Sequence, residues 1–498
     1  MTIKSSYAQI LKASSIMGGA AGINLLLGMV RVKFAAVLIG ATGVGLNASF
    51  GALQGLIGTL AGLGIQSSAV REIAAAVGKN DEHAIGRAVL TLRRICWLTG
   101  LAGMAAMMLL APLLSQLTFG HRDYALDIAA LGVVILFGNL SGGQMALIQG
   151  MRRIGDMARA NIVGAVFGTV AAIGFYATLG LRGIIPTLVA VSAVQLALSW
   201  HFARKVPVPK VELTLRQTFA EANGMVRLGL VFMANGLMGS AVAYITIALI
   251  TQYEGTQAVG LYSAAFALSG MFVSFVLGAM GADYYPRLTA AAGDKAAMSR
   301  MVNEQTEIGL LLALPGLLAT LALAPWILQL FYTREFLGAV ELLQWFILGC
   351  MGRVISWPLG YIMLALGKSS YLIVSESIMH AMHVVLIFAG LQVFGVIGVA
   401  YAFVLLYVLH VFVTLFIAKK LILFSWTRRA KATIFLASTA SLLLLVSSLQ
   451  LNQYNATLVG AAATLLSLII SASLIIKRTE AHDRFPLFKK AGRFFRSP

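Results

Sequence analysis

One apolar stretch of the chain carries an acid and two imidazoles at helical spacing. Glu376, His380 and His383 occupy positions i, i+4 and i+7 of the segment 370–391, so a helix would place them on one face. His410 lies at a similar depth in the next apolar segment. A carboxylate beside imidazoles can relay protons, because histidine titrates near neutral pH. The same residues would also suit a hydrogen-bonded structural cluster, and both interpretations stay open here.

The sequence gives little reason to expect a metal site. His380 and His383 are three residues apart, whereas two metal-binding histidines on a helix typically lie four apart. The chain's two cysteines, Cys96 and Cys350, lie in apolar segments, where a free cysteine usually acts as a small core residue. We therefore predict no metal, no disulfide framework and no cofactor.

Three further cations lie within apolar segments and are candidates for binding an anionic substrate. Arg31 and Lys33 lie in the segment 13–40, and Arg353 lies in the segment 338–366. An arginine at bilayer depth costs about 2.5–3.5 kcal/mol on insertion scales, so it usually faces a polar cavity or a partner. Arg31 and Lys33 could instead extend to the lipid headgroups. For Arg353, an ion pair with Glu341 or Glu376 is the alternative to a cavity-facing position.

The segment 44–70 carries four glycines on one helical face, namely Gly51, Gly55, Gly58 and Gly62. Close packing against another helix is the simpler interpretation, since small residues let transmembrane helices approach closely. The functional alternative is that the glycines leave room for a bulky substrate.

These candidates must be positioned by transmembrane helices. Of the 498 residues, 59% are hydrophobic and only 11% are charged, against about 25% charged in soluble domains. The sequence predicts an all-α polytopic membrane protein with about 14 transmembrane helices. The predicted spans are 13–40, 44–70, 94–114, 125–148, 159–180, 184–202, 227–251, 257–282, 304–330, 338–366, 370–391, 395–418, 431–450 and 456–476.

The distribution of positive charge predicts the orientation in the membrane. The net charge is +19, and nearly all Lys and Arg residues fall in alternate loops, whereas the opposite loops hold only Arg122, Arg182 and Arg334. Because cytoplasmic loops are enriched in Lys and Arg, we predict that both termini are cytoplasmic. This placement argues against a nucleic-acid partner. No loop is long enough to fold as a catalytic domain, so we predict that the protein is not an enzyme.

The chain repeats itself at an offset of 215 residues. VGLNASFGALQG at 44–55 matches VGLYSAAFALSG at 259–270, and the same offset aligns Gly40 with Gly255. An even number of spans per repeat gives both halves the same orientation. We predict the following parts: an N-lobe at 1–215, a C-lobe at 216–425, two further helices at 426–476 and a basic cytoplasmic tail at 477–498.

Three stretches resemble a known family: YAQILKASSIMGG at 7–19, LIGATGVGLNASF at 38–50 and ALIQGMRRIGDMARAN at 146–161. They resemble the polysaccharide flippases of the multidrug/oligosaccharidyl-lipid/polysaccharide exporter superfamily, within it the O-antigen and exopolysaccharide repeat-unit translocases. The resemblance covers the first twelve spans. It implies alternating-access transfer of an undecaprenyl-pyrophosphate-linked oligosaccharide from the cytoplasmic to the periplasmic leaflet of the bacterial inner membrane. The implied partners are that lipid-linked oligosaccharide, membrane lipids and other polysaccharide assembly proteins.

The murein lipid flippase branch is similar around Gly28, Arg31 and Gly40. The arginine of that branch is thought to contact the lipid pyrophosphate, so the resemblance implies this role for Arg31. In the eighth span, that branch has acidic and basic residues where this chain has Phe266 and Ala267. A murein lipid flippase nevertheless remains an alternative, as does a drug/cation antiporter, although neither the first nor the seventh span holds an interior acid. A membrane-embedded glycan polymerase or ligase is the alternative of another class.

Overall fold

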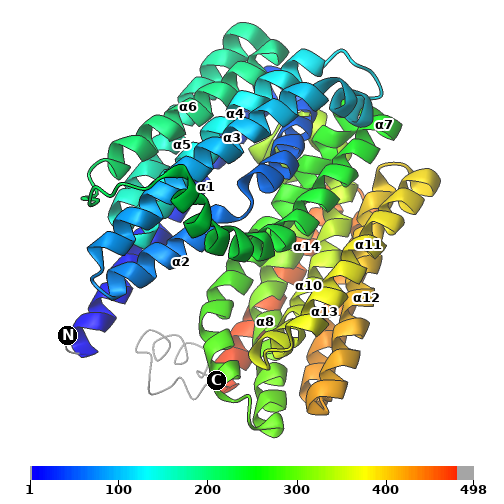
Figure 1. Cartoon of the computed structure of the whole chain (residues 1–498). Helices are drawn as coiled ribbons and strands as arrows, with labels where there is room; N and C mark the ends of the chain where they lie inside the picture. The colour runs from blue at the N-terminus through cyan, green and yellow to red at the C-terminus, as the bar shows by residue number, and fades with distance from the viewer. Residues whose placement is uncertain (1–2, 479–498) are drawn as a thin grey trace. The chain divides into compact units, whose positions relative to one another are not determined.

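The computed structural model describes the backbone of residues 3–478 and the side chains of residues 18–477 except Ala282. The predicted basic tail at 477–498 therefore lies almost entirely outside the described residues. Every regular element in the described range is a helix (Figure 1). The elements are α1 Ile3–Gly62, α2 Ile65–Gly78, α3 Glu82–Phe119, α4 Ala125–Gly150, α5 Ile154–Leu179, η1 Gly180–Gly183, α6 Ile184–Ala203, α7 Leu215–Ala290, α8 Lys295–Ala322, α9 Ala324–Phe331, η2 Arg334–Ala339, α10 Val340–Ala365, α11 Ser369–Phe394, α12 Ile397–Ile422, α13 Arg428–Gln450 and α14 Gln453–Arg478.

Eleven helical stretches in the described range are long and apolar enough to cross a membrane. Three of them, 18–62, 154–203 and 215–281, each cover most or all of two predicted spans. The first breaks at Gly40 with φ 63°, and the third breaks at Gly255 with φ 82°. Glycine adopts such positive φ angles without steric cost. The eleven stretches therefore account for all fourteen predicted spans, and the predicted fold class is confirmed.

The offset of 215 residues reappears in the backbone. Helices α4 and α10 are each 26 residues long and begin at Ala125 and Val340. Helices α5 and α11 are also 26 residues each and begin at Ile154 and Ser369. Each pair of starting residues is 215 positions apart, as are the two glycine breaks in α1 and α7. The repeated sequence thus produces repeated helix boundaries.

The first compact unit consists of residues 1–260 together with 331–333. Within it, α3 packs along α4, α4 packs on α6, and α5 packs on both α1 and α6 (Figure 1). Two clusters of buried apolar side chains fill the space between these helices, one around Leu92 and Leu147 and the other around Met107 and Leu131. These two clusters pack the helices of the first unit against one another.

The first half of α7 belongs to this unit because glycines let its backbone touch the turn between α1 and α2. A Cβ atom added at Gly229 would lie 2.4 Å from the carbonyl oxygen of Leu63. One added at Gly64 would lie 2.1 Å from the carbonyl oxygen of Gly229. The packing boundary at residue 260 consequently differs from the repeat boundary at residue 215.

The two repeated turns that follow Gly40 and Gly255 contact each other reciprocally. A Cβ atom at Gly45 would lie 1.8 Å from the carbonyl oxygen of Thr256, and one at Gly260 would lie 2.0 Å from that of Ala41. Gly45 and Gly260 are equivalent in the repeat, and so are Ala41 and Thr256. Only glycine fits at either position, because any side chain would meet backbone.

The second compact unit consists of residues 261–330 and 334–498. Here α10 and α11 both pack along α12, while α8 contacts α10, α13 and α14 (Figure 1). The loop before α13 is fixed by Asn303 of α8, whose Oδ1 accepts a hydrogen bond from the Thr427 amide at 2.8 Å. The last two helices are therefore packed parts of this unit.

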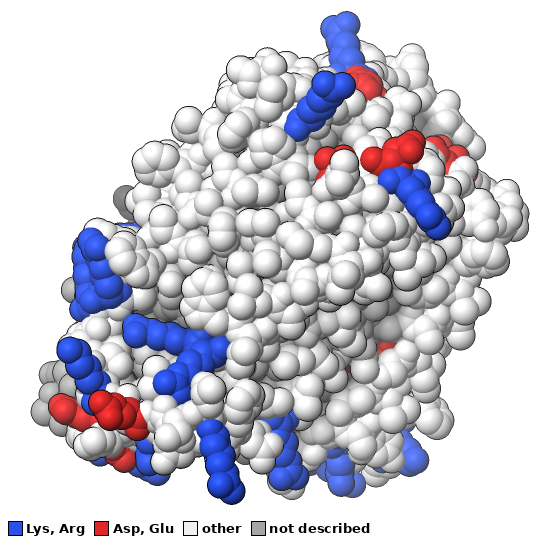
Figure 2. All heavy atoms as spheres, turned by 45° about the horizontal axis from the view of Figure 1, so that its top comes forward, with Lys and Arg blue, Asp and Glu red and all other residues white. Residues whose placement is uncertain are grey.

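The surface fits a lipid environment. Large apolar side chains are widely exposed, including Leu109 at 80%, Phe275 at 76% and Phe416 at 69%. Figure 2 shows broad areas without charged side chains, with Lys and Arg gathered in separate groups. Exposed apolar area of this extent is rare in soluble monomers and supports a protein that spans the membrane.

Candidate functional site

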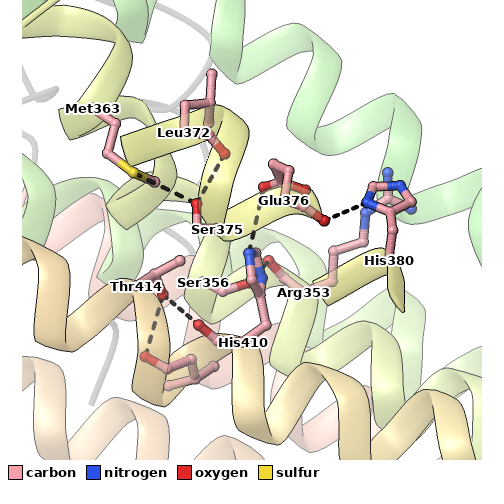
Figure 3. Close-up of polar contacts among 10 residues, drawn as sticks. Arg353, Ser356, Met363, Leu372, Ser375, Glu376, His380, His410 and Thr414 are labelled. Carbon is pink, nitrogen blue, oxygen red and sulfur yellow. Dashed lines mark hydrogen bonds and ion pairs between the residues drawn. The ribbon is translucent and has the colours of Figure 1, made fainter. Parts of the chain in front are cut away.

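Three helices of the second unit bring an acid, an imidazole and a hydroxyl together (Figure 3). His410 of α12 points between Glu376 of α11 and Ser356 of α10. The His410 Nε2 atom lies 3.6 Å from Glu376 Oε1, and its Nδ1 atom lies 3.1 Å from Ser356 Oγ. The hydrogen bond to Ser356 fixes the orientation of the imidazole ring, so that its other nitrogen faces the carboxylate.

Small residues on α10 allow this approach. Gly349 packs under Phe403, since an added Cβ atom would lie 2.4 Å from the Phe403 Cδ1 atom. Gly352 packs under Tyr407, with 3.0 Å from an added Cβ to the Tyr407 Cβ. Ser356 follows one turn later on the same face of α10. It therefore meets His410, which continues the face of α12 formed by Phe403 and Tyr407.

The two other predicted histidines have different surroundings. The His380 Nδ1 atom forms a 2.7 Å hydrogen bond with the backbone carbonyl oxygen of Glu376. His383 lies one turn further along α11, with its ring centroid 6.3 Å from that of Phe403. Glu376 and His410 are thus paired directly, His380 is attached to the same helical turn, and His383 stands apart from the pair.

The two members of the pair differ in exposure. The Glu376 side chain is 39% exposed, whereas that of His410 is 17% exposed. Both groups can be protonated or deprotonated, so the pair can take up or release a proton. Uptake of a proton by this pair would also change the net charge among α10, α11 and α12.

Arg353 lies one turn before Ser356 on α10, and its side chain extends toward α11 in Figure 3. Among the described side chains its guanidinium forms no ion pair with Glu341 or with Glu376, whose ionic partner is His410. Arg353 therefore retains an unneutralised charge.

Arg31 and Lys33 have different environments although they are two residues apart on α1. The Lys33 ammonium donates a hydrogen bond to the carbonyl oxygen of Tyr332. Arg31 is exposed and acts electrostatically on the hydroxyl of Tyr176 in α5. Among the side chains that the structure describes, the Arg31 guanidinium has no hydrogen-bond or ionic partner. Of the two cations, Arg31 is therefore the one whose N–H donors are available to bind a ligand.

Three of the four glycines of the second span, Gly55, Gly58 and Gly62, line a cavity of about 350 Å³ within the first unit. A Cβ atom added at Gly51, Gly55 or Gly58 would meet no atom within 4 Å. Within the first unit, these three glycines therefore face open space and not a closely packed helix. The other lining residues, four of which have polar side chains, are Gln54, Thr59, Gly64, Gln66, Ser67, Phe232 and Met233.

Sequence reasoning missed several of these residues. Gln54, Gln66 and Ser356 are polar side chains in apolar segments, and this signal was available. The spacing of Gly349, Gly352 and Ser356 also marks one helical face, but nothing in the sequence says which helix it meets. In the described part of the chain, no group of three or more His, Cys, Asp or Glu residues is arranged to hold a metal ion.

A family model described as "polysaccharide biosynthesis protein" matches residues 48–341, which is more than half of the chain. The chain belongs to this family. The lipid III flippase of Escherichia coli (strain K12) is 24% identical over 418 residues, covering 80% of this chain and 96% of the flippase. The lipid III flippase of Shigella flexneri matches to the same extent.

Two solved structures of transport proteins have a fold similar to that of this chain. The lipid II flippase MurJ in an inward closed conformation superposes with a TM-score of 0.69 and 16% identity, covering 94% of this chain and 99% of that one. An inward-facing multidrug resistance MATE family transporter of the MOP superfamily superposes with a TM-score of 0.65 and 15% identity, covering 80% and 95%. The chain therefore has the fold of these two transport proteins.

Proposed function

We propose that this protein is a flippase for a lipid-linked oligosaccharide. It carries an undecaprenyl-pyrophosphate-linked O-antigen or exopolysaccharide repeat unit from the cytoplasmic to the periplasmic leaflet of a bacterial inner membrane. Membership of the polysaccharide biosynthesis protein family supports this proposal. So does the similarity to proteins that are named lipid III flippases.

The observation that carries the proposal is the glycine-lined cavity of the first unit, which also holds two glutamine side chains. Sugar hydroxyls need both donors and acceptors, and the amides of Gln54 and Gln66 supply both. The open space beside Gly51, Gly55 and Gly58 leaves room for a bulky ring. An antiporter of small cations would need a carboxylate, and none is among the residues that line this cavity.

The pyrophosphate needs cations, and the proposal assigns this role first to Arg31. Its planar guanidinium can donate two parallel hydrogen bonds to one phosphate. Arg353 is the second candidate, because its charge is also unneutralised. Lys33 contributes less, since its ammonium already donates to Tyr332.

The proposed mechanism is alternating access of two six-helix lobes, 1–215 and 216–425, of like orientation. The glycine contact between the two repeated turns, at Gly45 and Gly260, would be formed in one state. It would be broken in the other state. Protonation of the Glu376–His410 pair would bias the lobes between these states, because it changes the charge where α10, α11 and α12 meet.

The decisive test of the substrate is deletion of the gene followed by analysis of lipid-linked glycans. The proposal predicts that an undecaprenyl-pyrophosphate-linked repeat unit accumulates in the cytoplasmic leaflet, while murein synthesis continues. Accumulation of the murein precursor with arrested growth would instead identify a murein lipid flippase. Normal export of both, together with sensitivity to toxic cations, would identify an antiporter.

A further inference from the structure

A basic pocket of about 640 Å³ lies in the first unit, apart from the residues assigned above. Its walls come from α3, α4, the end of α6 and the linker after α6. Three lining residues, Arg93, Arg204 and Lys210, are cations, and none of the lining residues is an acid. All three cations are exposed. Within the described part of the chain none of them has an ionic partner, so their charge is not neutralised.

The linker that forms one wall is held in place. The Arg94 guanidinium donates a hydrogen bond to the Leu213 carbonyl oxygen at 2.8 Å. The Arg153 guanidinium donates to the Lys205 carbonyl oxygen at 2.7 Å. These two bonds tie both ends of the linker to neighbouring helices. The pocket is therefore formed before any ligand arrives.

An apolar groove of about 390 Å³ continues from the pocket. The two share four lining residues, Trp97, Leu140, Gln144 and Trp200. From Trp200 the groove follows α6 to Ala193, about 10 Å at 1.5 Å per residue. The pocket thus takes a charged group and the groove takes an apolar chain attached to it.

Two tryptophans place this site at the membrane surface. Trp97 is 52% exposed and Trp200 is 55% exposed, and tryptophan prefers the interface between lipid and water. The Arg204 guanidinium lies 4.8 Å from the centre of the Trp200 ring and hydrogen-bonds His201 Nδ1 at 3.3 Å. Both contacts orient Arg204 beside the groove, and neither neutralises it.

We propose that this pocket and groove bind one anionic phospholipid of the cytoplasmic leaflet. The phosphate lies among Arg93, Arg204 and Lys210, and one acyl chain lies in the groove beside Trp97 and Trp200. Basic pockets between transmembrane helices on the cytoplasmic side recognise such head groups. The leaflet supplies phospholipid in great excess over any lipid-linked glycan, and the exposed tryptophans leave the site open to it.

The test uses the full-length protein in detergent, with bound phosphatidylglycerol counted by native mass spectrometry. Phosphatidylcholine with the same acyl chains is the control lipid. Arg204→Ala and Lys210→Ala are each expected to weaken phosphatidylglycerol binding about fivefold, and roughly thirtyfold together, from the usual contribution of a cation near anionic lipid. Ala197→Trp fills the groove, keeps every cation and is expected to cause a comparable loss. The double variant Lys419→Ala/Lys420→Ala is the matched control and should bind normally.

Unchanged binding by the Arg204→Ala/Lys210→Ala variant would overturn the proposal, and so would an equal loss in the control. Competition separates the sources of the phosphate. Inorganic phosphate that displaces the lipid at equal concentration would make this a site for the free ion. Undecaprenyl pyrophosphate that displaces phosphatidylglycerol at lower concentration would make it a substrate site. Elution volume and circular dichroism of each variant establish that it is folded.

Discussion

At the scale of single residues, Arg31 and Lys33 show how two neighbouring cations come to differ. Lys33 donates to the Tyr332 carbonyl oxygen, whereas Arg31 is exposed and its guanidinium is free among the described side chains. Positions two apart on a helix point about 200° apart. A phosphate would therefore meet one of the two cations and not both.

We expect Arg31→Ala to remove most transport. A hydrogen bond to a charged group contributes about 1.5–3 kcal/mol, which corresponds to roughly a ten- to hundredfold slower rate. Arg31→Lys keeps the charge but loses the two-pronged geometry and should retain part of the activity. Lys33→Ala should be tolerated better. Surface glycan in a complemented deletion strain is the readout, and the amount of protein in the membrane is the control. Full export by Arg31→Ala at normal protein levels would show that Arg31 does not bind the substrate.

For the Glu376–His410 pair we expect Glu376→Gln to abolish transport driven by a pH gradient. Glutamine keeps the size of the side chain but cannot carry a proton. The matched control is His383→Gln on the same helix, which should remain active because His383 lies outside the pair. Transport at imposed pH gradients in vesicles measures both. If Glu376→Gln responds to the gradient like the wild type, the pair is structural.

Helical spacing was enough to place Glu376 and His380 on one face of α11. It could not predict that His410 would pair with Glu376, because that depends on how α11 and α12 pack. Ser356 was missed for the same reason, since its partner lies 54 residues away. Local sequence therefore indicates the candidates, and packing between helices decides which of them meet.

At the scale of elements, the repeated turns after Gly40 and Gly255 are the feature that a side chain would disturb most. The atoms that exclude a Cβ at Gly45 and Gly260 belong to the backbone, which cannot swing aside as a flexible side chain can. The repeat at an offset of 215 residues predicted that the two turns are equivalent. It could not predict that they touch, nor that the first half of α7 packs with α1 and α2.

We expect Gly45→Ala and Gly260→Ala each to destabilise the protein by about 1–3 kcal/mol, the usual cost of overpacking. Gly51→Ala is the matched control, since its Cβ would meet no atom within 4 Å. In a helix this change should be neutral or stabilise by up to about 1 kcal/mol. The melting temperature of the purified protein measures the difference. Equal melting temperatures for Gly45→Ala and Gly51→Ala would mean that the two turns are not in contact.

At the scale of the whole molecule, the number of membrane spans was predicted from hydropathy, and the orientation in the membrane was predicted from charge. The fourteen spans follow from length and hydropathy, because a helix must expose apolar side chains to lipid along its whole length. The orientation is a separate prediction from the excess of Lys and Arg in alternate loops. The glycine-lined cavity could not be derived in this way, because a row of glycines is compatible both with close packing and with open space.

We expect reporter fusions after Lys431 to report the cytoplasm and fusions after Arg182 to report the periplasm. Lys431 lies in the first turn of α13 and Arg182 in the short helix η1, and the predicted topology places them on opposite sides of the membrane. Paired reporters, one active in each compartment, measure this directly. The reverse result at either position would be incompatible with fourteen spans and two cytoplasmic termini.

Transfer of a lipid-linked oligosaccharide across a bilayer is best measured with purified protein in liposomes. A labelled undecaprenyl-pyrophosphate-linked repeat unit is placed in both leaflets, and an enzyme added outside modifies only the glycans exposed there. With the wild-type protein, the inner pool should become accessible within the assay, whereas with Arg31→Ala the accessible fraction should stay near that of the outer leaflet. A lipid-linked repeat unit that remains inaccessible with the wild-type protein, while the murein precursor becomes accessible, would contradict the proposed function.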